Sequence, residues 1–138
     1  MAYIKFREMA HYFNFHKEID KKDLPEYVLQ YVLGDEKIWK AYGTRRDKCV
    51  FTNKKLILFD VQGITGKTKK IHIFPFNSIS SSAIVYKPRT VYLLFTFTSG
   101  YQMRLNYINL TAEDKKELRK LWTKLISYCQ NKEKELDI

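Results

Sequence analysis

The stretch Cys49–Ile79, CVFTNKKLILFDVQGITGKTKKIHIFPFNSI, decides the fold. Its short apolar runs are separated by Asn, Gly and Lys clusters, which predicts three β-strands joined by two turns. Asn53-Lys54 makes a plausible two-residue turn, because Asn tolerates the backbone conformation that such turns require. With this turn, four side chains share one face of the hairpin, which we assign to the core. The opposing pairs are Phe51 with Leu56 and Cys49 with Leu58.

The second turn contains Gly66-Lys67-Thr68, which invites comparison with a phosphate-binding loop. That loop needs Gly-x-x-x-x-Gly-Lys-Ser/Thr between a strand and a helix. Here Val61 stands five positions before Gly66, and Gly63 is too close. An alternating β pattern follows, so no helix N-terminus is available to hold phosphate. We therefore predict a hairpin turn and no ATP or GTP site.

The same stretch resembles the bacterial pleckstrin-homology domain family. The resemblance is carried by three motifs and by Arg46-Asp47 just upstream: Phe51–Leu58, Asp60–Lys67 and Phe74–Ile79. It implies a mainly β fold, a seven-stranded split β-barrel capped by a C-terminal α-helix. It implies no catalytic residue, because the family has no known common activity. We place this domain at residues 34–138, with its strands within 36–107 and its helix at 111–130.

Residues 1–33 are predicted to be a short helical extension that packs on the barrel or on a neighbouring subunit. Phe6, Met9 and Phe13 keep helical spacing, although residues 12–15 also fit a short strand. We favour the helix for this segment.

A second short helix is expected from about residue 24 to 33. Asp23 and Glu26 read as a capping box, and Gly34 stands where a helix ends. The apolar stripe of this helix is expected to pack on the barrel, and a partner-docking face is the alternative. It consists of Leu24, Val28, Tyr31 and Val32.

The last hairpin is predicted from Val91–Phe97 and Tyr101–Tyr107. A two-residue loop would put the apolar rows of the two strands on opposite faces. The three-residue loop Thr98–Gly100 instead pairs Phe97 with Tyr101 and aligns the rows, with glycine at the left-handed position. We therefore predict the three-residue loop.

A long C-terminal helix is predicted after Thr111, which caps it ahead of acidic residues in the first turn. Its apolar stripe is expected to close one end of the barrel. It consists of Leu118, Leu121, Trp122, Leu125, Ile126 and Cys129. Cys129 and Cys49 are expected to be thiols rather than a disulfide, because they fall in a helix and a strand of a predicted cytoplasmic protein.

The chain of 138 residues is long enough for one domain with a real core, and no stretch approaches the roughly 20 apolar residues of a membrane span. Charge enters the N-terminus too early for a signal peptide. We expect a cytoplasmic protein. The net charge is +10, and residues 36–110 hold thirteen basic and three acidic side chains. A field of this kind favours anionic partners, whether lipid head groups, nucleic acid or an acidic protein, although a lysine-rich composition that serves solubility is the simpler alternative.

The candidate anionic-partner patch comprises Lys40, Arg45, Arg46, Lys48, Lys67, Lys69 and Lys70. Lysines that protect a strand edge are the competing interpretation for the last three. The connection Gly43–Arg46 is too short to wrap an inositol phosphate, so we expect no specific phosphoinositide recognition. Diffuse attraction to anionic surfaces remains open, and it would place the protein at the inner membrane face.

The leading functional hypothesis is a non-enzymatic binding or assembly module that forms a homo-oligomer. Its motivation is the resemblance together with apolar side chains that point away from the core face and need a cover, since large exposed apolar patches often mark interfaces. The candidate subunit contact comprises Phe6, Phe13, Phe15, Val50, Ile57 and Phe59. The competing account is that residues 1–33 fold back over this face within one chain.

No enzyme is predicted. The three histidines, His11, His16 and His72, have no paired carboxylates nearby, so no metal site or catalytic triad assembles and no cofactor is expected. A peripheral adaptor for anionic membranes is the first alternative function. Single-stranded nucleic-acid binding ranks third, because aromatic residues interleave with the basic ones but no known motif supports it. These aromatics are Tyr42, Tyr86, Tyr92 and Tyr101.

Overall fold

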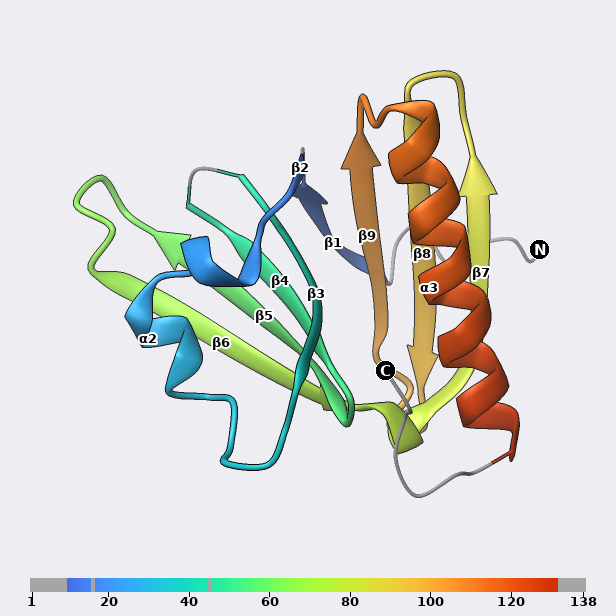
Figure 1. Cartoon of the computed structure of the whole chain (residues 1–138), viewed down its shortest axis with the longest axis horizontal. Helices are drawn as coiled ribbons and strands as arrows, with labels where there is room; N and C mark the ends of the chain where they lie inside the picture. Colours follow the sequence, from blue (N-terminus) through green and yellow to red (C-terminus); the bar gives the residue numbers. More distant parts are fainter. Residues whose placement is uncertain (1–9, 16, 45, 132–138) are drawn as a thin grey trace.

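The computed structural model describes residues 10–15, 17–44 and 46–131, which form two β-sheets and a long C-terminal helix (Figure 1). The elements in chain order are β1 (Ala10–Phe15), β2 (Lys17–Glu18), the 3-10 turn η1 (Lys21–Asp23), α2 (Glu26–Leu29), β3 (Ile38–Gly43), β4 (Lys48–Thr52), β5 (Lys55–Gln62), β6 (Thr68–Pro75), the 3-10 turn η2 (Phe76–Ser78), β7 (Ile79–Tyr86), β8 (Thr90–Phe97), β9 (Gln102–Ile108) and α3 (Ala112–Asn131).

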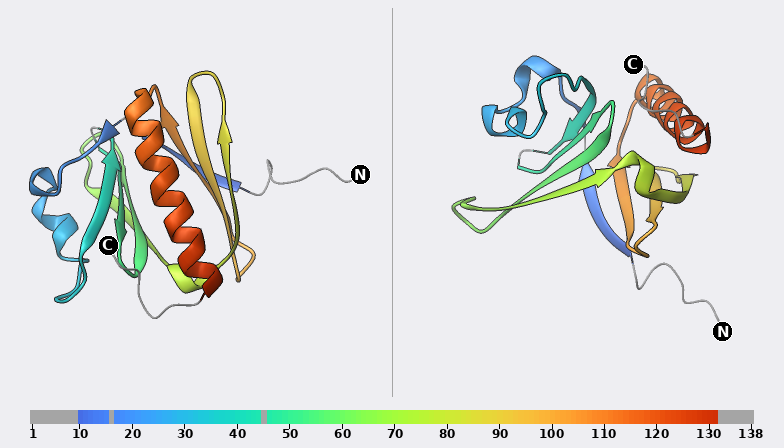
Figure 2. Two further views of the ribbon diagram at one scale, coloured as in Figure 1. Left: turned by 45° about the vertical axis from the view of Figure 1, so that its right-hand side comes forward. Right: turned by 90° about the horizontal axis from the view of Figure 1, so that it is seen from below.

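The two sheets have the strand orders β1-β9-β8-β7 and β2-β3-β4-β5-β6. All pairings are antiparallel except that of β1 with β9, which is parallel. The turn η2 carries the chain from the second sheet to the first, and α3 lies along the first sheet (Figures 1 and 2). Strands β3–β9 confirm the predicted seven-stranded split barrel with a C-terminal helix, and β1 and β2 add one strand to each sheet.

Both hairpins that were predicted from turn chemistry have the expected register. In the first, the two predicted pairs are both confirmed. In the last, the Phe97 N–H donates to the Tyr101 carbonyl at 2.9 Å, and Gly100 has a φ of +92°. The three-residue loop is therefore confirmed, because the apolar rows of β8 and β9 must face the same core.

The main core lies between the two sheets and α3. The hydroxyl of Thr111 accepts a hydrogen bond from the Asp114 N–H at 3.1 Å and caps α3, as predicted. Leu118, Leu121 and Leu125 of the predicted stripe are buried. The largest buried side chains of this core are Phe15, Tyr42, Phe51, Leu56, Leu58, Phe76, Leu93, Phe95, Met103 and Tyr107.

The predicted helix within residues 1–19 is wrong where the structure describes that segment, because residues 10–15 form strand β1. This strand pairs with β9, and the ring of Phe15 packs 5.7 Å from that of Tyr107. The side-chain amide of Asn106 also donates to Asn14 Oδ1 at 2.9 Å across the two strands. Pairing with a distant strand therefore decides the structure here, rather than local spacing.

The predicted helix at 24–33 is shorter than expected, since α2 covers only Glu26–Leu29. After α2 the N–H groups of Tyr31 and Val32 donate to carbonyls three residues back, at 3.1 and 3.2 Å, rather than four. The Leu33 N–H then donates to the Glu36 carboxylate at 2.9 Å, so the α-helical pattern does not continue to residue 33. The predicted capping box is also wrong, because Asp23 lies in η1 and α2 has no side-chain cap.

The outer face of the second sheet is covered by residues 19–33, which we call the cover segment (Figure 2). Val50, Ile57 and Phe59 are fully buried beneath it. The prediction that these three residues form an open subunit contact is therefore wrong, and the competing account of an intramolecular cover applies to them. The predicted stripe does pack on this face, together with Ile19 and Tyr27.

Candidate functional site: the projecting end of the β5–β6 hairpin

Strands β5 and β6 project as an arm beyond the rest of their sheet (Figures 1 and 2). Strand β4 begins at Lys48, which pairs with Phe59, so β5 has no β4 partner beyond that point. The two strands of the arm continue to pair with each other as far as Gln62 and Thr68. Residues 63–67 close the arm, and we call them the hairpin tip.

The connection between β3 and β4 holds the arm in place. The Val61 N–H donates to Asp47 Oδ1 at 3.0 Å, and the Arg46 guanidinium donates to the Gly63 carbonyl. The hydroxyl of Thr44 in turn accepts hydrogen bonds from the backbone N–H groups of Arg46 and Asp47, at 3.3 and 3.1 Å. These contacts present the tip in one defined arrangement.

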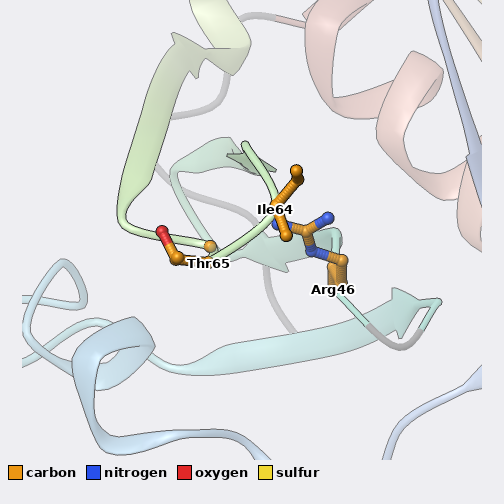
Figure 3. A pocket seen from close by; sticks show the side chains of 4 residues that line it. Arg46, Ile64 and Thr65 are labelled. Carbon is orange, nitrogen blue, oxygen red and sulfur yellow. The ribbon is translucent and has the colours of Figure 1, made fainter.

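At the hairpin tip the side chain of Ile64 is fully exposed. Arg46 points toward the tip from the β3–β4 connection, and a pocket of about 370 Å³ lies between them (Figure 3). Thr65 and Gly66 complete its lining. An apolar side chain thus stands beside a guanidinium at the end of the arm.

Three lysines lie at the end of the hairpin tip and in the first residues of β6. Lys67, Lys69 and Lys70 are all exposed. The ammonium of Lys69 lies 5.3 Å from the centre of the Tyr27 ring, a cation–π contact with the cover segment. Burial and then the negative charge of Asp47 raise the pKa of Tyr27, so the phenol stays neutral near pH 7. We call Arg46 and the three lysines the basic tip.

The structure does not bring the other candidate cations to this surface. Lys40 is paired with Glu18 at 3.1 Å and Glu117 at 3.8 Å. Lys48 is buried, and its ammonium donates to the Thr44 carbonyl at 3.2 Å. Their inclusion in the anionic-partner patch is therefore wrong, because both charges are engaged within the chain. Arg45 lies outside the described residues.

Three further residues, Phe6, Phe13 and Phe15, were predicted as subunit contacts. Phe15 is buried in the main core, so its prediction as a subunit contact is wrong. Phe13 belongs to strand β1. Phe6 lies outside the described residues.

Of the aromatics considered for nucleic acid, Tyr42 is buried and Tyr101 stacks on Phe74 with ring centres 5.4 Å apart.

Ile64 is the residue that sequence reasoning missed. The glycines and lysines of this turn predict a hairpin connection, but they assign no role to its isoleucine. A signal was present, since turns between strands are normally polar and an isoleucine between Gly63 and Gly66 breaks that pattern.

A buried charge cluster lies at the opposite end of the sheet, beside the β4–β5 turn. The Glu36 carboxylate accepts hydrogen bonds from the Leu33 N–H, from Lys55 Nζ at 2.9 Å and from the Thr52 hydroxyl at 3.1 Å. Burial alone would raise the pKa of Glu36, but these three donors outweigh it and hold the pKa below its usual 4.5. Every polar atom of this carboxylate is engaged, so the cluster serves stability.

The buried thiol and phenol of the main core do not form a reactive pair. Cys49 Sγ lies 3.8 Å from the Tyr107 hydroxyl, and burial raises the pKa of both groups. A thiol with a raised pKa is protonated near pH 7 and is a weak nucleophile. Cys49 and Cys129 are free thiols, as predicted. Among the residues that the structure describes, no group of three or more His, Cys, Asp or Glu side chains is placed to hold a metal ion.

Within the part of the chain that is described, no helix has the length and apolar character needed to span a membrane. The profile of the family described as "Bacterial PH domain" matches residues 9–86, more than half of the chain. The chain belongs to the bacterial PH domain family. The match begins just before β1, so the region that carries this family's pattern includes the N-terminal strands as well as the basic tip.

A curated bacterial protein is similar to part of this chain. An uncharacterised protein of Bacillus subtilis, YjqA, is 42% identical over 59 residues, which are 43% of this chain and 47% of that protein. The alignment thus spans about half the length of this curated relative.

Solved structures of bacterial PH proteins share the fold. A pleckstrin-homology-domain protein from Shewanella loihica is 28% identical with a TM-score of 0.64, covering 81% of this chain and 95% of that one. A pleckstrin-homology domain from Shewanella amazonensis is also 28% identical, with a TM-score of 0.53 over 75% and 83% of the two chains. A protein from Exiguobacterium sibiricum shares the fold at 16% identity, with a TM-score of 0.65 over 86% and 63%.

Proposed function

We propose that this bacterial PH domain is a non-enzymatic binding module that attaches to an anionic partner through the basic tip. The observation that carries the proposal is a group of four cations around the projecting arm: Lys67, Lys69 and Lys70 lie on the arm, and Arg46 reaches it from the β3–β4 connection. The ion pairs between described side chains use none of these four. No carboxylate of the described residues is therefore paired with these charges, and together they attract any anionic surface that approaches.

The acidic residues of the arm do not cancel this charge. Asp47 is bound to the Val61 N–H, and Asp60 accepts a hydrogen bond from the Gln62 side chain at 2.9 Å. Asp60 lies opposite Lys70 across the arm. The four cations therefore outnumber the two carboxylates, Asp47 and Asp60, in this region. The net field at this end is positive, and it supports recognition by charge rather than by the shape of one head group.

Cosedimentation with anionic vesicles and a pull-down on immobilised polyglutamate test this proposal. We expect salt-sensitive binding, because exposed charges are screened beyond about 8 Å at physiological ionic strength. A variant with Lys67→Gln, Lys69→Gln and Lys70→Gln should lose most of it. The matched control is Lys116→Gln, Arg119→Gln and Lys120→Gln on the exposed side of α3, which removes the same charge. Equal loss in both variants would show that only net charge matters and would contradict a site at the basic tip.

Self-association is a second candidate function, and the edge strand β7 favours it. Strand β7, Ile79–Tyr86, is the last strand of its sheet and contains no charged residue. Natural edge strands are usually protected by charges or proline, as β6 is by Lys69, Lys70 and Pro75. A second copy of the chain could pair with β7 and enter a closed homo-oligomer.

Light scattering on the full chain tests self-association. We expect a homo-oligomer whose mass falls when Ser81→Lys places a charge on the exposed part of β7. Ser99→Lys, in an exposed turn, is the matched control and should leave the mass unchanged. A monomeric wild-type protein at micromolar concentration would refute this second function and leave the basic tip unaffected.

A further inference from the structure

We propose that Ile64 is an apolar anchor that inserts into the interfacial region of an anionic lipid bilayer while the basic tip holds the surrounding head groups. This inference rests on the proposed function and names its partner. The bilayer is the occupant that the arrangement of charged and apolar groups at this end fits best.

Ile64 is well placed to insert into a bilayer. It is fully exposed at the outermost turn of an arm that extends beyond the sheet (Figures 2 and 3). The transfer of an isoleucine side chain from water to an apolar phase is favourable. Polar Thr65 and cationic Lys67 come after Ile64 in the hairpin tip. The tip therefore combines one exposed apolar side chain with a nearby positive charge.

In the free protein the hairpin tip is tied to the β3–β4 connection. The Arg46 guanidinium holds the Gly63 carbonyl, next to Ile64, and Asp47 holds the Val61 N–H. A pre-formed tip loses less conformational entropy on binding than a flexible loop would. Arg46 lies beside Ile64. The Arg46 guanidinium would therefore contact the lipid head groups when the Ile64 side chain reaches the boundary between head groups and acyl chains.

The directions of Lys69 and Lys70 favour a bilayer over an acidic protein as the partner. Successive strand residues point to opposite faces, so Lys69 and Lys70 project on opposite sides of the arm. Lys69 turns toward Tyr27 of the cover segment, whereas Lys70 shares its face with Asp60. A protein docked on one face of the arm would meet one of these cations. A planar anionic surface met end-on by the tip can attract both, together with Arg46 and Lys67.

Tryptophan fluorescence with the full chain tests the insertion. The variant Ile64→Trp is mixed with vesicles of equimolar phosphatidylglycerol and phosphatidylcholine that carry bromine either near the head groups or at the acyl-chain centre. The wild-type protein, with Trp39 and Trp122 partly buried, supplies the background signal. We expect extra quenching for the variant, greatest with bromine near the head groups, and none with pure phosphatidylcholine.

The matched affinity test compares Ile64→Ser with Leu33→Ser, which alters an exposed apolar residue near Glu36, away from the arm. We expect about tenfold weaker vesicle partitioning for Ile64→Ser, from loss of roughly two buried methylene equivalents, and no change for Leu33→Ser. Because Ile64 is fully exposed, its replacement leaves the fold intact, and circular dichroism checks this.

Three outcomes would overturn the insertion. If wild type and Ile64→Ser bind anionic vesicles equally and the tryptophan at position 64 is not quenched, attachment is by charge alone and the proposed function stands. If vesicles do not bind but immobilised polyglutamate does, the partner is an acidic protein and the proposed function again stands. If neither binds, the inference and the proposed function both fail.

Discussion

Replacing Glu36 with Gln should destabilise the protein by about 2 kcal/mol at pH 7, since hydrogen bonds to charged groups contribute about 1.5–3 kcal/mol each. The substitution keeps an oxygen for the Leu33 N–H but removes the charge that faces Lys55 Nζ at 2.9 Å. The Glu36 side chain is 2% exposed and that of Lys55 is 15% exposed, so solvent screens this pair little. For a domain of this size, we expect the melting temperature to fall by about 8 °C.

The destabilisation by Glu36→Gln should depend on pH. The folded state holds the pKa of Glu36 below its usual 4.5, so the carboxylate stabilises the fold fully above that value. This contribution is lost as the pH falls through the lower, folded-state pKa. Chemical denaturation of wild type and variant at pH 7 and pH 3 should therefore show a gap that narrows in acid.

The control for Glu36 is Asp35→Asn. Asp35 faces Lys54 at 3.7 Å, but its side chain is 83% exposed, and such surface pairs contribute about 0–1 kcal/mol. We expect almost no change for this variant at either pH. A gap for Glu36→Gln below about 0.5 kcal/mol at pH 7, a change typical of surface substitutions, would refute the assignment of Glu36 as a structural charge.

Three further predictions concern packing and the thiols. Val28→Ala in the cover segment should cost about 2 kcal/mol in urea denaturation, because Val28 is fully buried, whereas exposed Leu29→Ala should be nearly neutral. Gly43→Ala should cost about 1–3 kcal/mol in the same assay, because a Cβ there would lie 2.9 Å from a backbone carbonyl oxygen, whereas Gly34→Ala meets no atom within 4 Å. The buried Cys49 thiol, with its raised pKa, should react with Ellman's reagent at pH 8 only when the protein unfolds; rapid reaction in the native state would contradict this burial.

The strands of the split barrel were predictable because turn chemistry and alternation are local signals. Asn53-Lys54 set the register of one hairpin, and the glycine of the loop 98–100 set that of another. Similarly, the cap at Thr111 and the leucine stripe after it specify α3 from a short window of sequence.

The N-terminal strands were not predictable from local spacing. Strand β1 pairs with β9, and Asn14 bonds to Asn106 across 92 positions of the chain. A window of ten residues contains no signal of a pairing between strands so far apart in the sequence. Within such a window, the spacing of Phe6, Met9 and Phe13 matches a helix. Beyond α2, the Leu33 N–H likewise bonds to the Glu36 carboxylate, a contact that the spacing of apolar residues in 24–33 does not reveal.

The candidate site was predictable only in part, because a count of charges does not show which are paired. Lys67, Lys69 and Lys70 are exposed as their turn position indicated, but Lys40 is neutralised by acidic residues from β2 and α3. These partners are distant in sequence, and the fold alone brings them together. The same holds for the apolar face of β4 and β5, whose cover comes from residues 19–33.

Hydrogen–deuterium exchange on the full chain, with and without anionic vesicles, tests most directly whether the protein binds through the basic tip. The arm contains amides whose exchange reports contact at this end, whereas α3 provides an internal reference far along the chain. We expect vesicles to slow exchange in residues 60–70 and to leave exchange in residues 112–131 unchanged. Protection of α3 or of β7, with no change in the arm, would contradict binding through the basic tip.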